Sequence, residues 1–251
     1  MRFAPALLVV LLSASEAPPE DAIRRSAEAF SRNRQAAGDY VYREDIRIGL
    51  RDPASSFVPL DARAYEVTLV EGAPFFRLVE AGGTPVPDAI ARKEQARLEQ
   101  FSRDRRRGNS GEMRRFVLDY SALPETHDTA FVGLQDSGGR PCWVFDAVPK
   151  PGTRPGKDHS EWLRVNRLRV WIDRATAHPV RIDTWQDRPW KGAPGGTESS
   201  RVYHLAGAVW LPEWIELRQP RSPGAWNVTE QRYSNYRKFS AESAVRFSQP
   251  R

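Results

Sequence analysis

Residues 167–184 read R-L-R-V-W-I-D-R-A-T-A-H-P-V-R-I-D-T. Leu168, Val170 and Ile172 alternate with arginine and tryptophan, turn-forming residues follow at 173–176, and the apolar alternation resumes with Ile182. Because successive side chains of a strand point to opposite faces of a sheet, this period of two predicts a β-hairpin with one apolar face. The stretch therefore indicates an antiparallel sheet.

The same pattern continues on both sides of this hairpin. The alternation predicts further strands at residues 40–50, 65–69, 75–79, 129–134, 141–148, 199–205, 208–217 and 226–233. Helical spacing of apolar residues or composition predicts helices at 21–36, 88–107 and 111–120. Since no strand–helix–strand alternation is present, we expect one meandering antiparallel sheet. The chain is thus expected to be mainly β with helices (α+β), with one domain at 18–251 and a helical insertion at 88–120.

The first 17 residues have the three parts of a secretory signal peptide. Arg2 is followed by an apolar run at 3–12 and by small residues up to Ala17. The apolar run is too short to cross a bilayer, which needs about 20 residues. We expect cleavage after Ser15 or Ala17 and an exported, soluble protein. No cysteine lies near these positions, so we expect no lipid anchor.

Charge and cysteine content narrow the possible partners. Lys and Arg number 38 against 32 Asp and Glu, a formal net charge of +6. The densest basic run, residues 92–107, can contact a membrane surface or can be a solvated helix face. Phe101 is its single aromatic residue, which argues against nucleic acid as a partner. The lone Cys142 excludes an internal disulfide framework, and its apolar neighbours predict a buried strand residue.

Motifs for catalysis are weak throughout the sequence. Asp136-Ser137-Gly138-Gly139 superficially resembles the nucleophile region of trypsin-like serine proteases, but Gln135 replaces the expected glycine and a hairpin turn explains the stretch. Phosphate-binding, dinucleotide and calcium-loop patterns are missing from the sequence. We expect a non-enzyme without cofactor or metal, with an unrecognised catalytic group as the alternative.

Residues 168–181 carry a family resemblance. They resemble the W-I-D-x-x-T-x-x-P-x-R hairpin of periplasmic outer-membrane lipoprotein carrier and sorting proteins, the LolA/LolB-like superfamily. Residues 72–86, 139–148 and 233–239 are also similar to uncharacterised secreted relatives of that group. The resemblance implies a periplasmic protein with an open antiparallel half-barrel of about eleven strands wrapped around helices. It also implies an apolar cavity, which in the true carriers takes lipoprotein acyl chains.

A half-barrel of this kind turns one face of its strands toward the helices. The residues that alternation assigns to this face, and that we expect to line the cavity, are Tyr40, Tyr42, Tyr65, Val67, Leu168, Val170 and Ile182. The alternative is that helices fill the concavity and these residues are only core. The carriers' lid-holding arginine segment is missing, and Arg77 is the nearest candidate for a lid contact. Arg77 can equally be an outward-facing strand residue.

Three functions follow from these observations. The first is a non-catalytic, monomeric binding protein that holds a lipid or a lipoprotein acyl chain as carrier or sensor. The second is a protein-interaction or envelope-stress regulatory module without lipid transfer, and the third is an unrecognised enzyme. Lipid that copurifies with the protein favours the first, and a stable partner protein without lipid favours the second.

Overall fold

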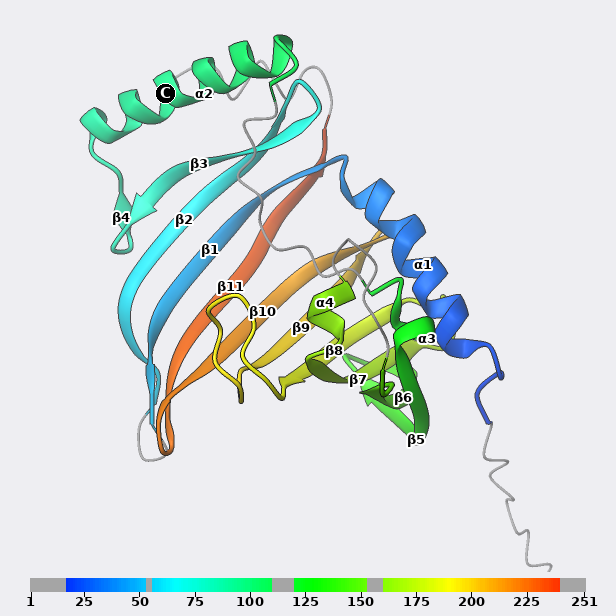
Figure 1. Ribbon diagram of the computed structural model, residues 1–251. Helices are drawn as coiled ribbons and strands as arrows, with labels where there is room; N and C mark the ends of the chain where they lie inside the picture. The colour runs from blue at the N-terminus through cyan, green and yellow to red at the C-terminus, as the bar shows by residue number, and fades with distance from the viewer. Residues whose placement is uncertain (1–16, 53–55, 110–119, 153–159, 240–251) are drawn as a thin grey trace, which may run out of the picture.

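The computed structural model describes residues 17–52, 56–109, 120–152 and 160–239. Eleven strands form one sheet in the order β4-β3-β2-β1-β11-β10-β9-β8-β7-β6-β5 (Figure 1). The strands are β1 (Tyr40–Arg51), β2 (Val58–Val70), β3 (Ala73–Ala81), β4 (Thr84–Pro85), β5 (His127–Ser137), β6 (Arg140–Pro149), β7 (Asn166–Asp173), β8 (Pro179–Gln186), β9 (Glu198–Ala206), β10 (Val209–Ser222) and β11 (Ala225–Lys238).

All ten neighbouring strand pairs are antiparallel. Since β4 and β5 stand at the two ends of the order, the sheet is open. The prediction of an open antiparallel sheet of about eleven strands with helices is confirmed. The expected signal peptide and the expected helix at 111–120 lie outside the described residues, apart from Ala17 and Tyr120, and stay predictions.

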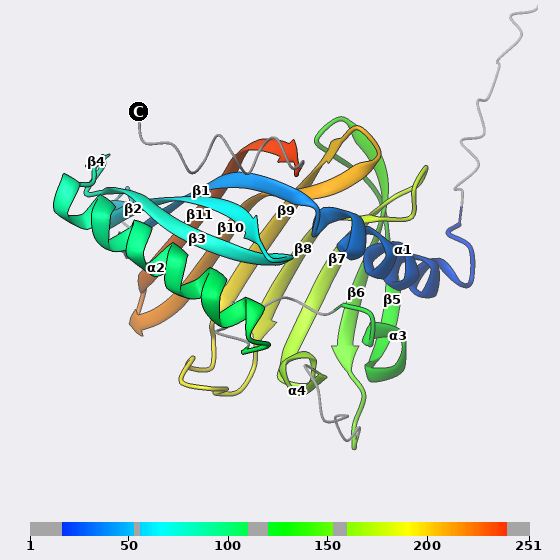
Figure 2. The same ribbon diagram turned by 90° about the horizontal axis from the view of Figure 1, so that it is seen from above.

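Three helices lie together on one side of the sheet, over the strands of the second half of the chain (Figures 1 and 2). They are α1 (Ala22–Ala37), α3 (Leu123–Thr126) and α4 (Ser160–Leu163). Helix α1 begins one residue after the expected start, and Asp21 occupies the N-cap position without a capping hydrogen bond. Its carboxylate instead pairs with Arg24 at 2.7 Å. The apolar side of α1, with Ile23 and Phe30, is buried.

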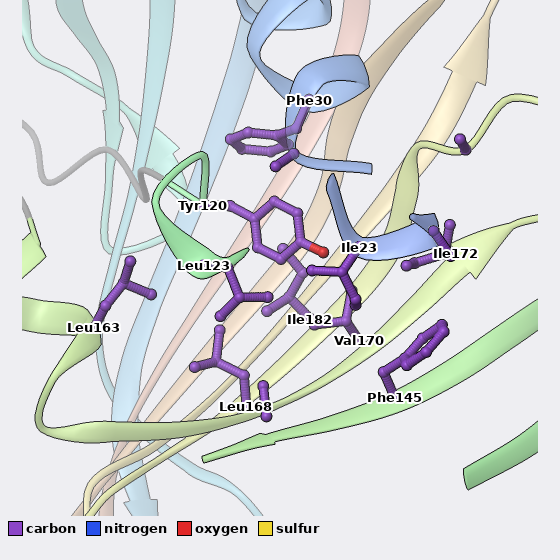
Figure 3. Packing of buried hydrophobic residues seen from close by; sticks show 14 of the residues in the cluster. Ile23, Phe30, Tyr120, Leu123, Phe145, Leu163, Leu168, Val170, Ile172 and Ile182 are labelled. Atoms are coloured by element: carbon purple, nitrogen blue, oxygen red, sulfur yellow. The ribbon is translucent and has the colours of Figure 1, made fainter. Parts of the chain in front are cut away.

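The largest cluster of buried apolar side chains joins α1 to β6, β7 and β8. Figure 3 shows Phe30 and Ile23 gathered with Tyr120 near Val170 and Ile182. The Phe30 and Tyr120 rings meet edge to face with centroids 5.6 Å apart. Each large apolar side chain that is fully buried contributes about 1.5–3 kcal/mol relative to an exposed one, so this contact attaches the helix to the sheet.

The fourth helix, α2 (Asp88–Arg106), runs along β3 at the opposite edge (Figure 2). The Leu78 backbone N–H donates to Glu94 Oε2 at 3.0 Å, and Arg97 donates to the carbonyl oxygen of Phe76. The Arg97 guanidinium also lies 4.5 Å from the centroid of the Phe75 ring. Within the described parts of the chain, the sheet continues beyond β3 only as the two residues of β4. Helix α2 therefore satisfies backbone groups that an edge strand would otherwise leave unpaired.

Replacing Phe30 with alanine should lower the free energy of unfolding by about 3 kcal/mol, because a buried ring is lost and a cavity is left. Urea denaturation measures the change. Arg32→Ala, on the exposed side of α1, is the control and should change stability by less than about 0.5 kcal/mol. Equal stability of Phe30→Ala and the wild type would contradict the packing described for α1.

Replacing Glu94 with alanine should speed hydrogen exchange of the Leu78 amide about tenfold, because the N–H loses a charged acceptor worth about 1.5 kcal/mol. Exchange followed by NMR tests this. Glu99→Ala is the matched control, since the Glu99 carboxylate accepts from Gln95 within α2. If the Leu78 amide exchanges at the same rate in both variants, Glu94 does not stabilise this edge of the sheet.

Candidate functional site: the inner face of the sheet

The face of the sheet that packs against α1 is called the inner face. Partner residues on neighbouring strands share a face, so the registers extend it from Ile182 on β8 through Arg201, Ile215 and Gln231 to Ile46 on β1. On β1 and β2 the inner face therefore carries Tyr42, Glu44, Tyr65 and Val67.

Glu44 lies in the middle of this half of the inner face. Its side chain is fully buried, and in register it stands between Tyr65 on β2 and Tyr233 on β11. Burial raises the pKa of Tyr236 above its usual value, and the nearby tyrosines and the Glu44 carboxylate raise it further. The Tyr236 hydroxyl therefore stays protonated and can act as a hydrogen-bond donor.

Four tyrosines form an aromatic cluster on β1 and β11, called the tyrosine cluster: Tyr40, Tyr42, Tyr233 and Tyr236. The Tyr42 ring centroid lies 5.2 Å from that of Tyr236 and 5.7 Å from that of Tyr233, and Tyr40 lies 6.4 Å from Tyr236. The Tyr236 hydroxyl donates to the Pro212 carbonyl oxygen at 2.7 Å. All four side chains are only partly buried. Partly exposed rings with oriented hydroxyls suit a ligand with an apolar body and a polar end.

The seven residues predicted to line a cavity fall into two groups. Those on β1 and β2 are the half-buried Tyr40, Tyr42 and Tyr65 and the buried Val67. Those on β7 and β8 are Leu168, Val170 and Ile182, which are at most 1% exposed and belong to the core under α1. Strands β9, β10 and β11 separate the two groups, so the structure does not bring all seven together.

Arg77 lies on the face opposite to Val67. Across β2 and β3, Val67 pairs with Phe76 and Glu66 pairs with Arg77, so the two pairs point to opposite faces. The Arg77 guanidinium forms an ion pair with the Glu66 carboxylate. Of the two orientations considered for Arg77, the structure shows the outward one.

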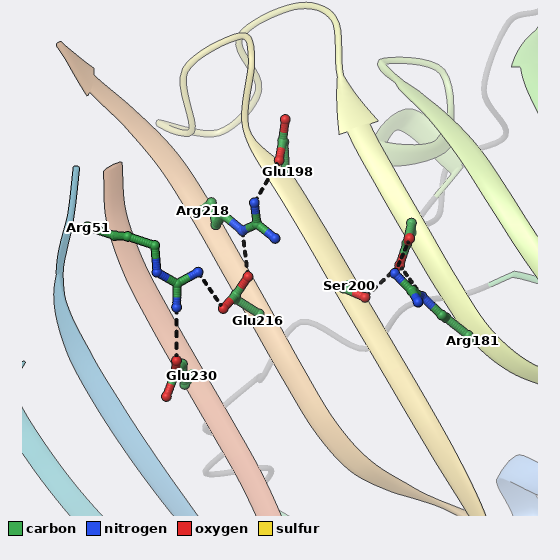
Figure 4. A network of polar contacts seen from close by, with 8 residues as sticks. Arg51, Arg181, Glu198, Ser200, Glu216, Arg218 and Glu230 are labelled. Carbon is green, nitrogen blue, oxygen red and sulfur yellow. Dashed lines mark hydrogen bonds and ion pairs between the residues drawn. The ribbon is translucent and has the colours of Figure 1, made fainter. Parts of the chain in front are cut away.

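The outer face of the sheet carries charged side chains that the sequence analysis did not single out. Figure 4 shows Glu216 between two arginines, with Arg51 at 3.0 Å and Arg218 at 2.5 Å. Arg51 also pairs with Glu230 at 3.2 Å. Glu216 is only 4% exposed and Glu230 only 8%, yet both carboxylates have cationic partners. This pairing is what allows two acidic residues to be buried on one face.

A cavity of about 300 Å³ opens on this outer face, with Trp185 and Trp214 among its lining residues. Arg181 contacts Asp183 through two nitrogens, at 3.0 and 2.7 Å. Arg218 pairs with Glu198 at 3.5 Å in addition to Glu216. The lining guanidinium groups thus already have carboxylate partners, and the charged side chains that line the cavity balance in sign. The sequence contains a signal for this charged face, because residues 181 and 183 and residues 216 and 218 are charged and lie two positions apart on their strands.

Two buried histidines are held in the neutral form. His178 is 1% exposed and stacks on Trp210 with centroids 5.3 Å apart and planes 4° apart. Neither ring nitrogen finds a hydrogen-bond partner among the described residues, and burial lowers the pKa of His178 to about 4. Burial also lowers the pKa of His127, whose Nε2 contacts the Asn166 carbonyl oxygen at 3.0 Å.

Cys142 is fully buried in β6, as predicted. Burial, with smaller contributions from nearby carboxylates, raises the pKa of its thiol to about 12. The thiol therefore stays protonated and is a poor nucleophile. Within the described ranges, no group of three or more His, Cys, Asp or Glu side chains could hold a metal ion.

Stability should fall as the pH decreases from about 6.5 to about 4, because the unfolded chain binds a proton at His178 that the folded chain excludes. The shift of His178 corresponds to about 3 kcal/mol. His178→Phe keeps a ring against Trp210 and should remove the loss of stability that comes from His178. The loss of stability that comes from His127 should remain. Urea denaturation at pH 7 and pH 4 measures both proteins. The same pH dependence in both would show that His178 is not excluded from protonation.

None of the helices in the described part of the chain has the length and apolarity needed to cross a bilayer. Neither a family model nor a curated protein matches the sequence. Solved structures do match. The structural neighbours include a lipoprotein-sorting protein domain and a LolA superfamily protein.

Three of these neighbours illustrate the level of similarity. A putative outer membrane lipoprotein-sorting protein domain from Vibrio parahaemolyticus is 12% identical with a TM-score of 0.40, covering 90% of this chain and 100% of that one. A LolA superfamily protein from Nitrosomonas europaea is 8% identical with a TM-score of 0.36, covering 91% and 97%. The lipoprotein LppX from Mycobacterium tuberculosis is 9% identical with a TM-score of 0.30, covering 88% and 98%.

Proposed function

We propose that this chain is an exported, periplasmic, non-catalytic binding protein that holds a lipid or a lipoprotein acyl chain, as carrier or sensor. The observation that carries the proposal is the tyrosine cluster. Its rings are partly exposed on the inner face of β1 and β11, whereas α1, α3 and α4 contact β10, β5 and β7. On the same face of β1, Ile48 is 39% exposed, which adds apolar surface.

The proposed ligand site is the inner face of β1, β2 and β11. Leu168, Val170 and Ile182 are already covered by the apolar side of α1 and by Tyr120. Tyr40, Tyr42 and Tyr65 are therefore the members of the expected cavity lining that we assign to the site, whereas Val67 is only 2% exposed and is buried like the other three. Each methylene group removed from water contributes about 0.8 kcal/mol, so eight buried carbons contribute about 6 kcal/mol before the cost of association.

We further propose that α2 contacts anionic membrane surfaces. Arg97 and Arg106 of the basic run 92–107 are engaged with the sheet, through Phe76 and Glu71. Arg92 and Lys93 are exposed on the same helix. Exposed cations near an anionic lipid surface contribute about 1 kcal/mol each, which would hold the protein where a lipid cargo enters or leaves.

The test is a titration of delipidated protein with a fluorescent fatty-acid probe. Tyr42→Ser should weaken saturable binding about tenfold, because it removes ring area worth about 1.4 kcal/mol from the inner face. Trp185→Ser is the matched control, since Trp185 is also a half-buried aromatic residue but lines the cavity on the outer face. This control should leave binding unchanged.

Absence of saturable binding, together with a lipid-free native mass of the purified protein, would refute the lipid proposal. Weakening by Trp185→Ser but not by Tyr42→Ser would move the site to the outer face. A stable partner protein without lipid would favour the interaction module instead.

A further inference from the structure

Two neighbouring cavities lie on the outer face of the sheet, and Trp185 on β8 lines both of them. The cavity of about 300 Å³ described above extends over β8, β9 and β10, and a second cavity of about 260 Å³ extends over β6, β7 and β8. These volumes lie near the lower end of the range for ligand pockets, which is about 300–1,000 Å³. Together the cavities suit a ligand that passes over Trp185 from one cavity to the other.

The strand register places Trp185 in a row with charged residues on both sides. Trp185 pairs with Arg167 on β7 and with Glu198 on β9, and Glu198 in turn pairs with Arg218 on β10. Residues in such a row share one face of the sheet. Trp185 is half-buried, and Trp214 also lines the first cavity. An indole ring among hydrogen-bonding groups suits a ligand that is apolar on its flat face and polar at its edge.

The charged side chains of both cavities are held in pairs of opposite sign. Each of the four arginines that line the cavities has a carboxylate partner within 3.5 Å, in the pairs Arg167–Asp187, Arg169–Asp146, Arg181–Asp183 and Arg218–Glu198. A ligand with a net charge would have to compete with one member of such a pair and would lose its own hydration. The pairing therefore favours a neutral ligand.

These pairs still have hydrogen-bonding capacity. Figure 4 shows Arg218 between two carboxylates: its Nε donates to Glu216 and its Nη1 contacts Glu198 Oε2, so neither Arg218 Nη2 nor Glu198 Oε1 has a partner among the described residues. Arg181 contacts Asp183 through Nε and Nη2, and its Nη1 has no partner in the described part of the chain. The Arg181, Glu198 and Arg218 side chains are 41%, 34% and 39% exposed. The first cavity thus offers two donors and one acceptor, each charged and therefore strong.

We propose that Trp185 and the two cavities beside it bind a neutral oligosaccharide. A pyranose ring has C–H groups on its flat face, which pack on an indole ring, and hydroxyl groups at its edge, which both donate and accept hydrogen bonds. In the first cavity the hydroxyl groups accept from Arg181 and Arg218 and donate to Glu198. The second cavity holds the next saccharide unit. This site lies on the face opposite to the tyrosine cluster, so it does not depend on the proposed lipid site.

Isothermal titration calorimetry of the full chain tests the proposal with four neutral probes, which are cellohexaose, maltohexaose, mannohexaose and N-acetylchitohexaose. We expect saturable binding of at least one probe, weakened about tenfold by Trp185→Ser because the stacking surface is lost. Trp185→Phe keeps an aromatic ring and should retain most of the affinity. Trp226→Ser is the matched control and should bind like the wild type, since Trp226 is also a half-buried tryptophan of the sheet but lines neither cavity.

The hydrogen bonds and the neutrality of the ligand are tested separately. Glu198→Ala removes the acceptor and should weaken binding about tenfold, whereas Glu213→Ala, exposed on β10 and outside both cavities, should not. The affinity should change less than about twofold between about 0.05 M and about 0.5 M NaCl, because no net charge is neutralised. Circular dichroism confirms that each variant is folded.

Three results would overturn the proposal. The first is no saturable binding of any of the four sugars up to about 5 mM. The second is equal weakening by Trp185→Ser and Trp226→Ser. The third is tighter binding of the anionic hexagalacturonate, or of the zwitterion glycine betaine, than of every neutral sugar, which would assign the cavities to a charged ligand. Failure of the fatty-acid titration would leave this proposal intact, because the two sites lie on opposite faces.

Discussion

Each strand of an open sheet offers backbone N–H and C=O groups on both sides, and the two outermost strands keep one side without a strand partner. The edge at β3 and the edge at β5 differ in how these groups are covered. At β3, a short added strand and the Glu94 and Arg97 side chains of α2 occupy the free side. At β5, three exposed apolar side chains lie beside a backbone that has no second strand partner among the described residues. A helix without a fully buried residue thus stabilises one edge of the sheet, while the more apolar β5 edge has no such cover among the described residues.

The two faces of the sheet are also unequal. Over β6–β8 the inner face is closed by α1 and Tyr120, which makes it an ordinary core. Over β1 and β11 the same face presents partly exposed tyrosines around the buried Glu44. The outer face buries carboxylates such as Glu216 by pairing them with arginines from neighbouring strands. On the inner face, stability and binding capacity are therefore located in different halves of one continuous sheet.

Alternation in the sequence predicted the strands well, because a period of two is a local property. It could not separate Val170 from Tyr42, since both lie on the inner face and differ only in whether a helix covers them. Coverage depends on where α1 docks, which involves residues far apart in sequence. The Arg77–Glu66 pair was hidden for the same reason, because a partner on another strand depends on register. The burial of Glu216 likewise depends on Arg51, which is 165 positions away.

Strand order also constrains the sequence of events as the chain folds. All eleven strands have a partner next to them along the chain, and they form one meander from β1 to β4 and another from β5 to β11. The two meanders meet only where β1 pairs with β11, for example Glu44 with Tyr233. Closing a contact over so long a stretch of chain costs entropy and slows assembly. During synthesis from the N-terminus, β1 can therefore pair with β11 only after β11 has been made. The sheet is thus completed only when nearly all of the chain has been synthesised.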